Sequence, residues 1–379
     1  MLLGRELGCY SPAALYVRTS QGQQKSFHFM PEPVSPPPRR PTLQDVARAA
    51  GVSLSTVDRV INLRANVRAD TARRIAEAAA RLGFHGRGVI EQRLLEQRRT
   101  VRLGFLLWKR NTAFYRGLAD GLAEAAAACV RAQVRVTIGY LDNLDPEATA
   151  ARMLALRGEV DALGIVAADH PAVREAATAL RAASLPVAAL VSELAASTGA
   201  GYVGLDNRRV GRTAAWFVAQ LARQPGAVAL MVGSQRFQCQ ELCELSFRSF
   251  LREHSEDWEL PAPRLTLEDE TFAYENTLDL LSGQPDLAGL YVGGGGIEGV
   301  LRALREQRGA RPVVVCHDLT PVTRAALNDG IVQVVLSHPL AELARSAVDL
   351  LVEAATGREA TSALPKRILP IQIDIPESV

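Results

Sequence analysis

The sequence lacks the features of several large classes of protein. Its 379 residues contain no uncharged apolar run of about 18 residues, the length of a membrane-spanning helix, so we expect no membrane span. The first residues, MLLGRELGCYSPAALYV, hold charges and a proline where a secretory signal has a basic start and an unbroken apolar core. The cysteines are few, odd in number and widely spaced: Cys9, Cys129, Cys239, Cys243 and Cys316. Such a set is not typical of a disulfide framework, and it indicates a reducing compartment.

Motifs of catalysis and of metal binding are absent as well. We find no G-x-S-x-G nucleophile elbow, no G-x-x-x-x-G-K-[ST] phosphate loop and no residue spacing typical of zinc ligands. Cys239 and Cys243 stand four residues apart and can share a helix face, but further ligands are missing nearby. We therefore interpret both as small apolar helix residues, and we predict no catalytic residue, no metal and no cofactor.

Charge is unevenly distributed along the chain. The formal net charge is +2. Residues 1–99 hold 16 Arg and Lys against 8 Asp and Glu, a net +8, whereas residues 100–379 hold 27 against 33, a net −6. A basic end joined to an acidic body indicates a nucleic-acid-binding module, although basic tails also serve solubility.

The first 41 residues are predicted to be a disordered N-terminal extension. The segment PEPVSPPPRRP cannot hold a helix, because proline lacks the amide donor and fixes φ. Met30 stands just before this segment, which leaves two interpretations open. Either Met30 is the true start and residues 1–29 are an upstream extension of the reading frame, or residues 1–29 are a disordered tail of the protein.

Residues 42–84 predict three short helices arranged as a helix-turn-helix domain. Thr42 begins Thr-Leu-Gln-Asp, a cap-like start, and the first helix continues almost to Gly51. Gly51 supplies the left-handed turn conformation that a Cβ disfavours. Ser53 caps a second helix with the sequence LSTVDRVIN, and a third helix is expected at about residues 70–82.

The second helix is expected to enter the major groove of double-stranded DNA, while the first crosses the backbone. Arg59 can bond a guanine edge bidentately, and Asp58 can accept from cytosine N4 or orient Arg59. Small polar side chains nearby suit phosphate oxygens. The pattern predicts DNA contacts from Thr42, Ser53, Leu54, Ser55, Thr56, Asp58, Arg59 and Asn62.

The same segment resembles the heads of the LacI/GalR family of transcription regulators, which read T-x-x-D-V-A-x-x-A-G-V-S-x-x-T-V-S-R-V-x-N. Val67 and Thr71 fit the family's continuation into the third helix and are expected to contact DNA. The resemblance covers the chain from about residue 42, and it implies a homodimer or a tetramer on a palindromic operator. The matching residues of the motif are Thr42, Asp45, Val46, Ala47, Ala50, Gly51, Val52, Ser53, Thr56, Val57, Arg59, Val60 and Asn62.

Two features depart from that family. Asp58 replaces the serine that usually precedes the arginine, so the family's operator rules do not carry over directly. The predicted hinge or linker, residues 85–100, contains glycines and lacks the family's proline. Leu94, or its neighbour Leu95, takes the place of the leucine that wedges the minor groove and bends DNA. Because glycines raise the entropic cost of ordering the hinge, we expect hinge folding to depend on operator contact.

From Val101 onward, short apolar runs such as VRLGFLLW, VDALGIVA and RPVVVCHD alternate with helical stretches. This alternation indicates an α/β fold of doubly wound parallel sheets covered by helices, with more strands than one compact sheet needs. The resemblance implies that residues 101–379 form a two-lobed, periplasmic-binding-protein-like sensor of the ribose-binding type. The same residues are expected to make the dimer contacts. We expect lobe 1 at about residues 101–206 and 317–336, and lobe 2 at about 207–316 and 337–379.

Polar and aromatic residues follow several of these predicted strands. In such folds ligands bind between the lobes, at the carboxyl ends of the strands. The loop after VRLGFLLW resembles the family's Asn-x-x-Phe-(Phe/Tyr) loop, in which aromatic rings stack on a sugar and the asparagine bonds a hydroxyl. Each residue alone has a local alternative as a helix cap or strand end. The predicted ligand contacts here are Asn111, Phe114, Tyr115, Asp169, His170, Asp318 and His338.

Two features of sugar-binding relatives are missing. Cys243 stands where such relatives usually have an arginine that binds ring hydroxyls. Arg236 or Gln238 is expected to replace that arginine, and we choose Arg236 as the predicted ligand contact. The run LAGLYVGGGG ends in glycines around Gly294, whose amides either bind an anion or admit a bulkier ligand. The predicted effector is a sugar, a polyol or a derivative of one.

The sequence thus predicts a ligand-responsive transcription regulator, a repressor of genes for carbohydrate or polyol uptake and catabolism, in the cytoplasm and on the nucleoid. Two other functions stay open. An enzyme on a sugar-binding fold would need a nucleophile and base in the cleft. A transport-type binding protein would carry a secretory signal and no basic head.

Overall fold

The computed structural model describes residues 39–62, 67, 69–90, 99–143, 145–307, 311–357 and 363–379. They belong to two compact units, residues 1–93 and 94–379, each of which is described on its own. Within the described residues, no helix is long and apolar enough to cross a bilayer.

The N-terminal unit is a three-helix head made of α1 (Leu43–Ala50), α2 (Leu54–Asn62) and α3 (Ala69–Leu82). Each helix is amphipathic, because its apolar residues recur at a helical period. The apolar faces meet in a small core of buried side chains from all three helices, among them Val46, Val57, Val60 and Ile75. The predicted helix-turn-helix is therefore present, with the predicted boundaries met within one residue.

The start of the predicted linker packs on the head. Phe84 and Ile90 are buried, and residues 87–90 are helical. A Cβ at Gly86 would lie 2.5 Å from the Phe84 ring, so this glycine allows the chain to fold back over that ring. Residues 91–98 lie outside the described part of the chain.

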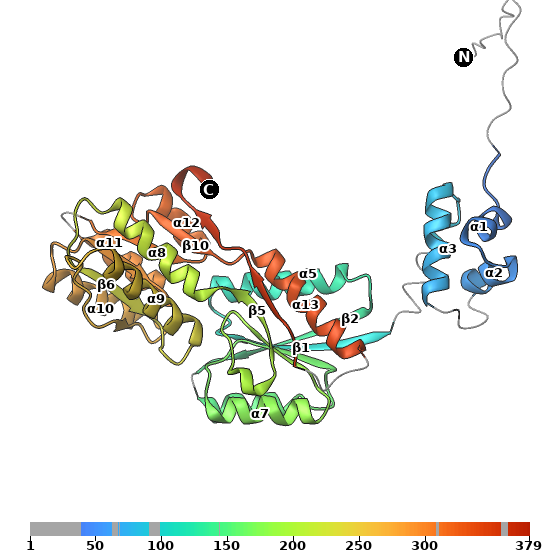
Figure 1. Ribbon diagram of the computed structural model, residues 1–379, viewed down its shortest axis with the longest axis horizontal. Coiled ribbons are helices and arrows are strands. Elements are labelled where there is room, and N and C mark those ends of the chain that lie inside the picture. Colours follow the sequence, from blue (N-terminus) through green and yellow to red (C-terminus); the bar gives the residue numbers. More distant parts are fainter. Residues whose placement is uncertain are drawn as a thin grey trace, which may run out of the picture. The chain divides into compact units, whose positions relative to one another are not determined.

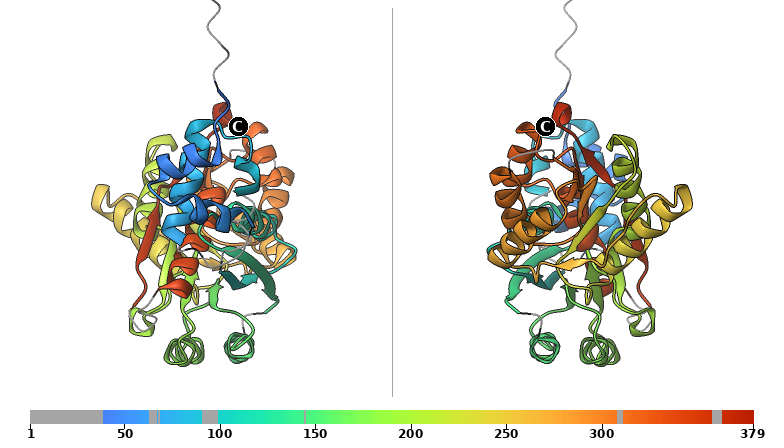
Figure 2. Two further views of the ribbon diagram at one scale, coloured as in Figure 1. Left: turned by 90° about the vertical axis from the view of Figure 1, so that its right-hand side faces the viewer. Right: turned by 90° about the vertical axis from the view of Figure 1, so that its left-hand side faces the viewer.

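The second unit contains two α/β lobes (Figure 1), and the first is built on a six-stranded parallel sheet of order β11-β5-β4-β3-β1-β2. In Figure 1, α5 and α13 lie on one side of this sheet and α7 on the other, while Figure 2 shows the paired α6 and α7 end-on. The strands and helices of this lobe are β1 (Thr100–Trp108), α5 (Ala113–Ala128), β2 (Gln133–Leu141), α6 (Pro146–Ala155), β3 (Ala162–Ile165), α7 (Pro171–Ala182), β4 (Val187–Leu190), η1 (Ala196–Thr198), β5 (Gly201–Leu205), α13 (Leu340–Thr356) and β11 (Lys366–Leu369).

The second lobe has a sheet of order β12-β10-β9-β8-β6-β7, parallel except for the antiparallel strand β12. Alternate residues face opposite sides of a strand. Val228 and Leu230 therefore join the core under α8 and α9, and Ala229 and Met231 join a second core under α10, α11 and α12. The elements of this lobe are α8 (Asn207–Leu221), β6 (Val228–Val232), α9 (Gln238–His254), β7 (Arg264–Leu265), α10 (Glu270–Gly283), β8 (Gly289–Val292), α11 (Ile297–Glu306), β9 (Val313–His317), α12 (Pro321–Asn328), β10 (Val334–Ser337), β12 (Gln372–Asp374) and η2 (Pro376–Ser378).

The division of the chain between the lobes differs from the sequence expectation. Residues 317–336 were expected in the first lobe, but β10 pairs with β9 inside the second sheet. Residues 337–379 were expected in the second lobe, but α13 packs on α5 and β11 extends the first sheet beside β5. The chain crosses between lobes after β5, after β10 and after β11. The sequence pattern marks strands and helices but does not say with which sheet each strand pairs.

Candidate functional site

The N-terminus of α1 is fixed by a reciprocal cap. The backbone N–H of Asp45 donates to Oγ1 of Thr42 (3.4 Å), and the backbone N–H of Thr42 donates to the Asp45 carboxylate (2.8 Å). The hydrogen bonds that the hydroxyl and the backbone N–H of Thr42 donate to the carboxylate hold the pKa of Asp45 below its usual value. The Thr42 hydroxyl also donates to Asp45 at 2.7 Å. This predicted DNA contact is thus first a structural cap that orders the start of the head.

The turn between α1 and α2 depends on Gly51. Its φ is +63°, in the left-handed region, and its amide donates to the carbonyls of Ala47 and Arg48 at the end of α1. The Arg74 guanidinium of α3 donates to the carbonyl of Gly51 at 3.2 Å and to that of Ala50. A cation at the C-terminus of a helix is favourable, so Arg74 helps to hold α3 against α1.

The helix α2 presents a polar face to solvent. Val57 and Val60 are buried on its inner face. Asn62 Nδ2 donates to Asp58 Oδ1 at 2.6 Å, one turn away, so Asp58 has a partner that the sequence analysis did not consider. On the outer face the predicted DNA contacts are exposed or half-buried: Ser53, Leu54, Ser55, Thr56, Asp58, Arg59 and Asn62.

The other predicted DNA contacts lie nearer to α3. Thr71 is half-buried in the first turn of this helix, and Val67 is half-buried just before it. Leu94, the predicted minor-groove wedge, lies outside the described residues. The structure thus brings most of the predicted contacts to α2 and leaves the wedge as a prediction.

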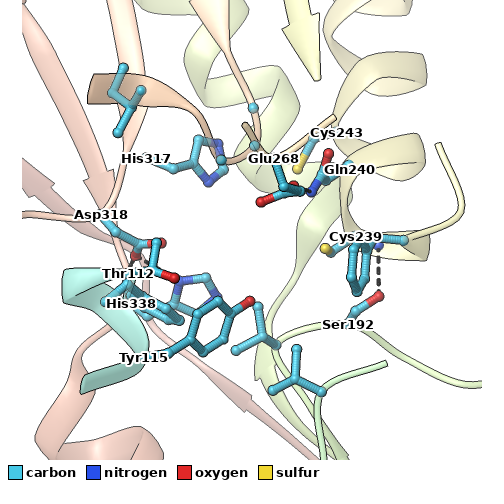
Figure 3. Close-up of a pocket in the computed structure, with 18 of the residues that line it drawn as sticks. Thr112, Tyr115, Ser192, Cys239, Gln240, Cys243, Glu268, His317, Asp318 and His338 are labelled. Carbon is cyan, nitrogen blue, oxygen red and sulfur yellow. Dashed lines mark hydrogen bonds and ion pairs between the residues drawn. The ribbon is translucent and has the colours of Figure 1, made fainter. Parts of the chain in front are cut away.

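A pocket lies between the two lobes of the second unit (Figure 3). Its walls come from residues at or just after the ends of β1, β3, β4, β5, β6, β7, β8, β9 and β10, so they gather at the carboxyl ends of the strands. The pocket encloses about 870 Å³ of space, part of it open to solvent. Five of the nine predicted ligand residues line it: Phe114, Tyr115, Gly294, Asp318 and His338.

The other four predicted ligand residues do not line the pocket. Asp169 is paired with Arg174, whose Nη2 lies 2.5 Å from its carboxylate, and it also accepts from the Ala195 amide. Its own amide donates to the carbonyl of Arg236 at 3.1 Å, so these two predicted residues meet at a junction of the lobes. His170 accepts from Ala172 as the N-cap of α7. Asn111 is exposed beside the start of α5.

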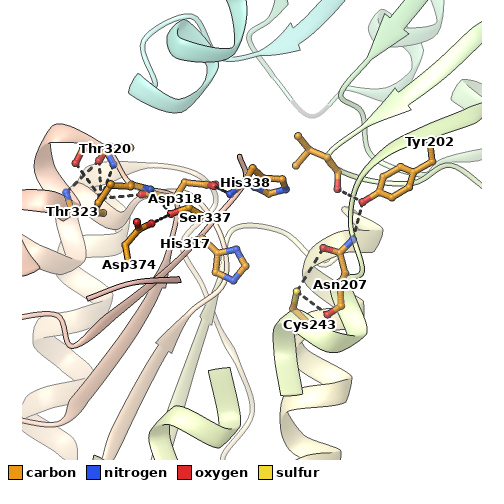
Figure 4. Close-up of polar contacts among 12 residues, drawn as sticks. Tyr202, Asn207, Cys243, His317, Asp318, Thr320, Thr323, Ser337, His338 and Asp374 are labelled. Carbon is orange, nitrogen blue, oxygen red and sulfur yellow. Dashed lines mark hydrogen bonds and ion pairs between the residues drawn. The ribbon is translucent and has the colours of Figure 1, made fainter. Parts of the chain in front are cut away.

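Asp318 and His338 form one polar wall of the pocket (Figure 4). Asp318 Oδ1 accepts from the backbone N–H and from ring Nδ1 of His338, both at 2.9 Å. Burial opposes ionisation of Asp318, but the contacts with His338 outweigh it and hold the pKa of Asp318 below its usual value. His338 is only 7% exposed, and its Nε2 has no hydrogen-bond partner in the described part of the chain. With Nδ1 bonded to Asp318, Nε2 is available to a ligand, as an acceptor on a neutral ring and as a donor on a charged one.

Glu268 and Gln240 form the opposite wall, which the sequence analysis missed. Gln240 Nε2 donates to Glu268 Oε1 at 2.8 Å, and burial raises the pKa of Glu268. A Cβ at Gly295 would lie 2.0 Å from Glu268 Oε2, and one at Gly294 would lie 2.6 Å from Gln240 Oε1. The glycine run therefore makes room for this pair of side chains. It was the one signal in the sequence that pointed to them.

His317 and two cysteines complete the polar lining. His317 Nε2 lies 2.7 Å from the hydroxyl of Tyr291, and burial lowers the pKa of His317 to about 4, so its ring is neutral at pH 7. Burial raises the pKa of Cys239 to about 12 and also raises that of Cys243. Both thiols lie on α9 as small neutral groups, and no cluster of three or more potential metal ligands occurs among the described residues.

Strained backbone surrounds this pocket. Positive φ angles occur at Lys109 (27°), Val191 (65°), Glu268 (56°) and Asp318 (60°). Such angles are costly for residues with a Cβ, above all for β-branched valine. Because three of these residues line the pocket and Lys109 Nζ donates to the Glu268 carbonyl at 2.6 Å, the strain is concentrated where the lobes meet the cavity.

Comparisons with known proteins agree with both halves of this description. A family model described as "periplasmic binding protein domain" matches residues 103–359, and one described as "bacterial regulatory proteins, lacI family" matches residues 42–86. Catabolite control protein A of Priestia megaterium is 36% identical over 85 residues, which are 22% of this chain and 25% of that protein. The HTH-type transcriptional regulator pepR1 of Lactobacillus delbrueckii subsp. lactis is 30% identical over 146 residues, or 38% of this chain and 42% of that one. The matched stretches thus span less than half of these relatives.

Solved structures match the two-lobed unit. An ABC transporter solute binding protein from Agrobacterium vitis with bound D-fucose has a TM-score of 0.67 and 17% identity, covering 73% of this chain and 96% of that one. A solute binding protein from Bacillus halodurans with bound myo-inositol has a TM-score of 0.63, 17% identity and the same coverage. At this identity the likeness shows the fold alone. The chain belongs to the periplasmic binding protein domain family and carries at its head the regulatory domain of the bacterial lacI family.

Proposed function

We propose that the protein is a ligand-responsive transcription regulator that binds a palindromic DNA operator as a homodimer. In this proposal it represses genes for carbohydrate or polyol uptake and catabolism, acts in the cytoplasm, and has no catalytic activity. The observation that carries the proposal is the combination of an exposed polar face on α2 of a capped helix-turn-helix with a lined pocket between two lobes. The names of the relatives, transcription regulators, and the sugars bound by the matching solute binding proteins support it.

The pocket explains how a small molecule would control the head. Polar lining groups come from both lobes, so a ligand that contacts both favours one arrangement of the lobes over others. That preference is the free energy available for changing operator affinity. Expected ligand contacts are Phe114, Tyr115, Asp318 and His338, to which the structure adds Glu268 as a candidate.

Operator binding is the first test. Selection from random duplexes, followed by fluorescence anisotropy at one fixed salt concentration, yields specific and non-specific affinities. Arg59→Ala is expected to weaken specific binding by about 1–3 kcal/mol, because a lost guanine contact affects only the matched site. Arg73→Ala, which removes an exposed arginine on α3, is the matched control. Equal specific affinity of Arg59→Ala and the unaltered protein would remove Arg59 from base reading.

Ligand control is the second test. A thermal-shift screen of sugars, polyols and their derivatives finds binders, because a ligand that binds only the folded state raises its stability. Each binder is then added to the operator titration. A binder that leaves operator affinity unchanged contradicts the regulatory proposal, and a product seen by mass spectrometry after incubation would favour an enzyme instead.

A further inference from the structure

The lining of the pocket is acidic. Among the described residues that form its walls are three carboxylates, those of Glu268, Glu298 and Asp318, and neither lysine nor arginine. A cavity of this sign attracts cations and repels anions. This argues against one of the two roles expected of the glycine run, namely binding an anion through its amides.

The three carboxylates differ in how they are compensated. Asp318 is paired with His338, 2.9 Å away. Glu298 stands in the first turn of α11, where the helix dipole favours a negative charge. Glu268 has the neutral amide of Gln240 as its side-chain partner, and the nearby Lys109 ammonium donates to its backbone carbonyl instead of its carboxylate.

The surroundings of Glu268 would strengthen an interaction with a cation. Burial raises the pKa of this carboxyl, and repulsion from Glu298 adds to the rise. Hydrogen bonds from Gln240 and the Gly295 amide and the charge of Lys109 lower it, but they do not offset the burial. Figure 3 shows the Glu268 carboxylate pointing into the cavity between His317 and Gln240. The walls also include the rings of Phe114 and Tyr115, and aromatic faces attract cations.

A second, independent feature indicates what else the ligand must carry. His338 is 7% exposed, lines the pocket and leaves Nε2 without a partner in the described part of the chain. Because Asp318 accepts from Nδ1, Nε2 is the ring atom left for a ligand, as an acceptor on a neutral ring and as a donor on a charged one. Buried polar atoms are normally hydrogen-bonded, so a ligand hydroxyl, which can donate or accept, would complete the site.

We propose that the effector is a hydroxylated primary amine, of the amino-sugar or aminocyclitol class, whose ammonium group pairs with Glu268 while a hydroxyl forms a hydrogen bond with Nε2 of His338. This inference rests on the proposed function and narrows its ligand class. Glu298 adds a second negative charge to the ammonium end of the pocket. Within the class expected from the sequence (a sugar, a polyol or a derivative), an amine carries the positive charge that compensates Glu268, whereas a neutral sugar offers only hydroxyl donors.

The test compares probes that differ only in one amino group. Full-length protein is titrated by calorimetry with D-glucosamine against D-glucose, and with D-galactosamine against D-galactose. In at least one pair the amine is expected to bind roughly tenfold to a hundredfold more tightly, the factor typical of a hydrogen bond to a charged group. Amine affinity is also expected to rise with pH while Glu268 loses its proton, and binding is expected to release a proton to buffer.

Two matched variants distinguish pairing from general charge. Glu268→Gln is expected to lose most of the preference for the amine over its matched neutral sugar. Glu270→Gln, at an exposed position on α10 outside the pocket lining, is expected to leave that preference unchanged. The pH dependence is measured on the unaltered protein, so it applies even where a variant folds poorly.

Three results would overturn the inference: no amine that binds, neutral sugars that bind as tightly as their amines, or an amine preference that survives Glu268→Gln. A neutral sugar that binds and changes operator affinity would refute this ligand class and leave the proposed function standing. Absence of specific operator binding under all conditions would instead refute the proposed function.

Discussion

The contact between Asp318 and His338 allows a quantitative test of the pocket. Asp318 accepts two hydrogen bonds from His338 and has φ of +60°, and its side chain is 19% exposed. Hydrogen bonds to charged groups contribute about 1.5–3 kcal/mol each. Alanine also disfavours the left-handed region by about 1 kcal/mol. Allowing for partial exposure, we expect Asp318→Ala to lower the free energy of unfolding by about 3–5 kcal/mol, as for other broken buried pairs.

Asp318→Asn is the matched control. Asparagine tolerates the left-handed region and keeps an oxygen acceptor for His338, so we expect a loss of only about 1–2 kcal/mol. Urea unfolding followed by tryptophan fluorescence measures both values, because all three tryptophans lie in the two-lobed unit. The same proteins are then used in the operator titration. There Asp318→Ala is expected to keep basal DNA binding and to lose the ligand response.

The pH dependence follows from the lowered pKa of Asp318. A carboxyl with a depressed pKa contributes stability that is fully present above its unfolded value of 3.8 and is lost as the pH falls through the folded value. The difference in the free energy of unfolding between the unaltered protein and Asp318→Ala should therefore become smaller below pH 3.8. The reasoning is refuted if alanine and asparagine have equal effects below about 1 kcal/mol, or if Asp318→Ala responds fully to ligand.

Two further predictions concern the head and the pocket. Thr42→Ala removes the reciprocal cap of α1 and should destabilise the head by about 0.5–2 kcal/mol, measured by circular dichroism. Thr42→Ser keeps the hydroxyl and should be nearly neutral. Equal losses of stability in the two variants would contradict the capping role. Burial lowers the pKa of His317 from 6.5 to about 4, so the folded state binds fewer protons between these values and stability should rise with pH across this window. The rise is at most about 3 kcal/mol. In His317→Gln the urea midpoint of unfolding should depend less on pH than in the unaltered protein. An unchanged dependence of the midpoint on pH would assign it to other groups.

The ligand site was only half predictable from the sequence. Asp318 and His338 directly follow predicted strands, and the rule that ligands bind at the carboxyl ends of parallel strands was enough to indicate them. Phe114 and Tyr115 lie in the first turn of α5, and the resemblance of their loop to the LacI/GalR family's indicated them. Asp169 follows a strand as well, but it is paired with Arg174 outside the pocket. The same rule therefore cannot tell a residue that faces the cavity from one that is engaged by its neighbours.

Glu268 shows what sequence reasoning lacked. The residue follows a strand of only two residues, and its position depends on Gln240 and on the glycines after β8. Lys109, which donates to its carbonyl, is 159 residues away in the chain. No local pattern reports such contacts, because they form only when both lobes have folded.

By itself, the sequence determined the helix-turn-helix and the two-lobed α/β class. These features are local: Thr42 caps α1, Gly51 has the φ that the turn requires, and apolar residues recur at the periods of helices and strands. Tertiary structure decided which lobe holds β10, α13 and β11, and which side chains line the pocket. Strand pairing and the positions of buried charges depend on contacts between segments that are distant in the sequence. The free energy of these contacts cannot be read from any short stretch of sequence.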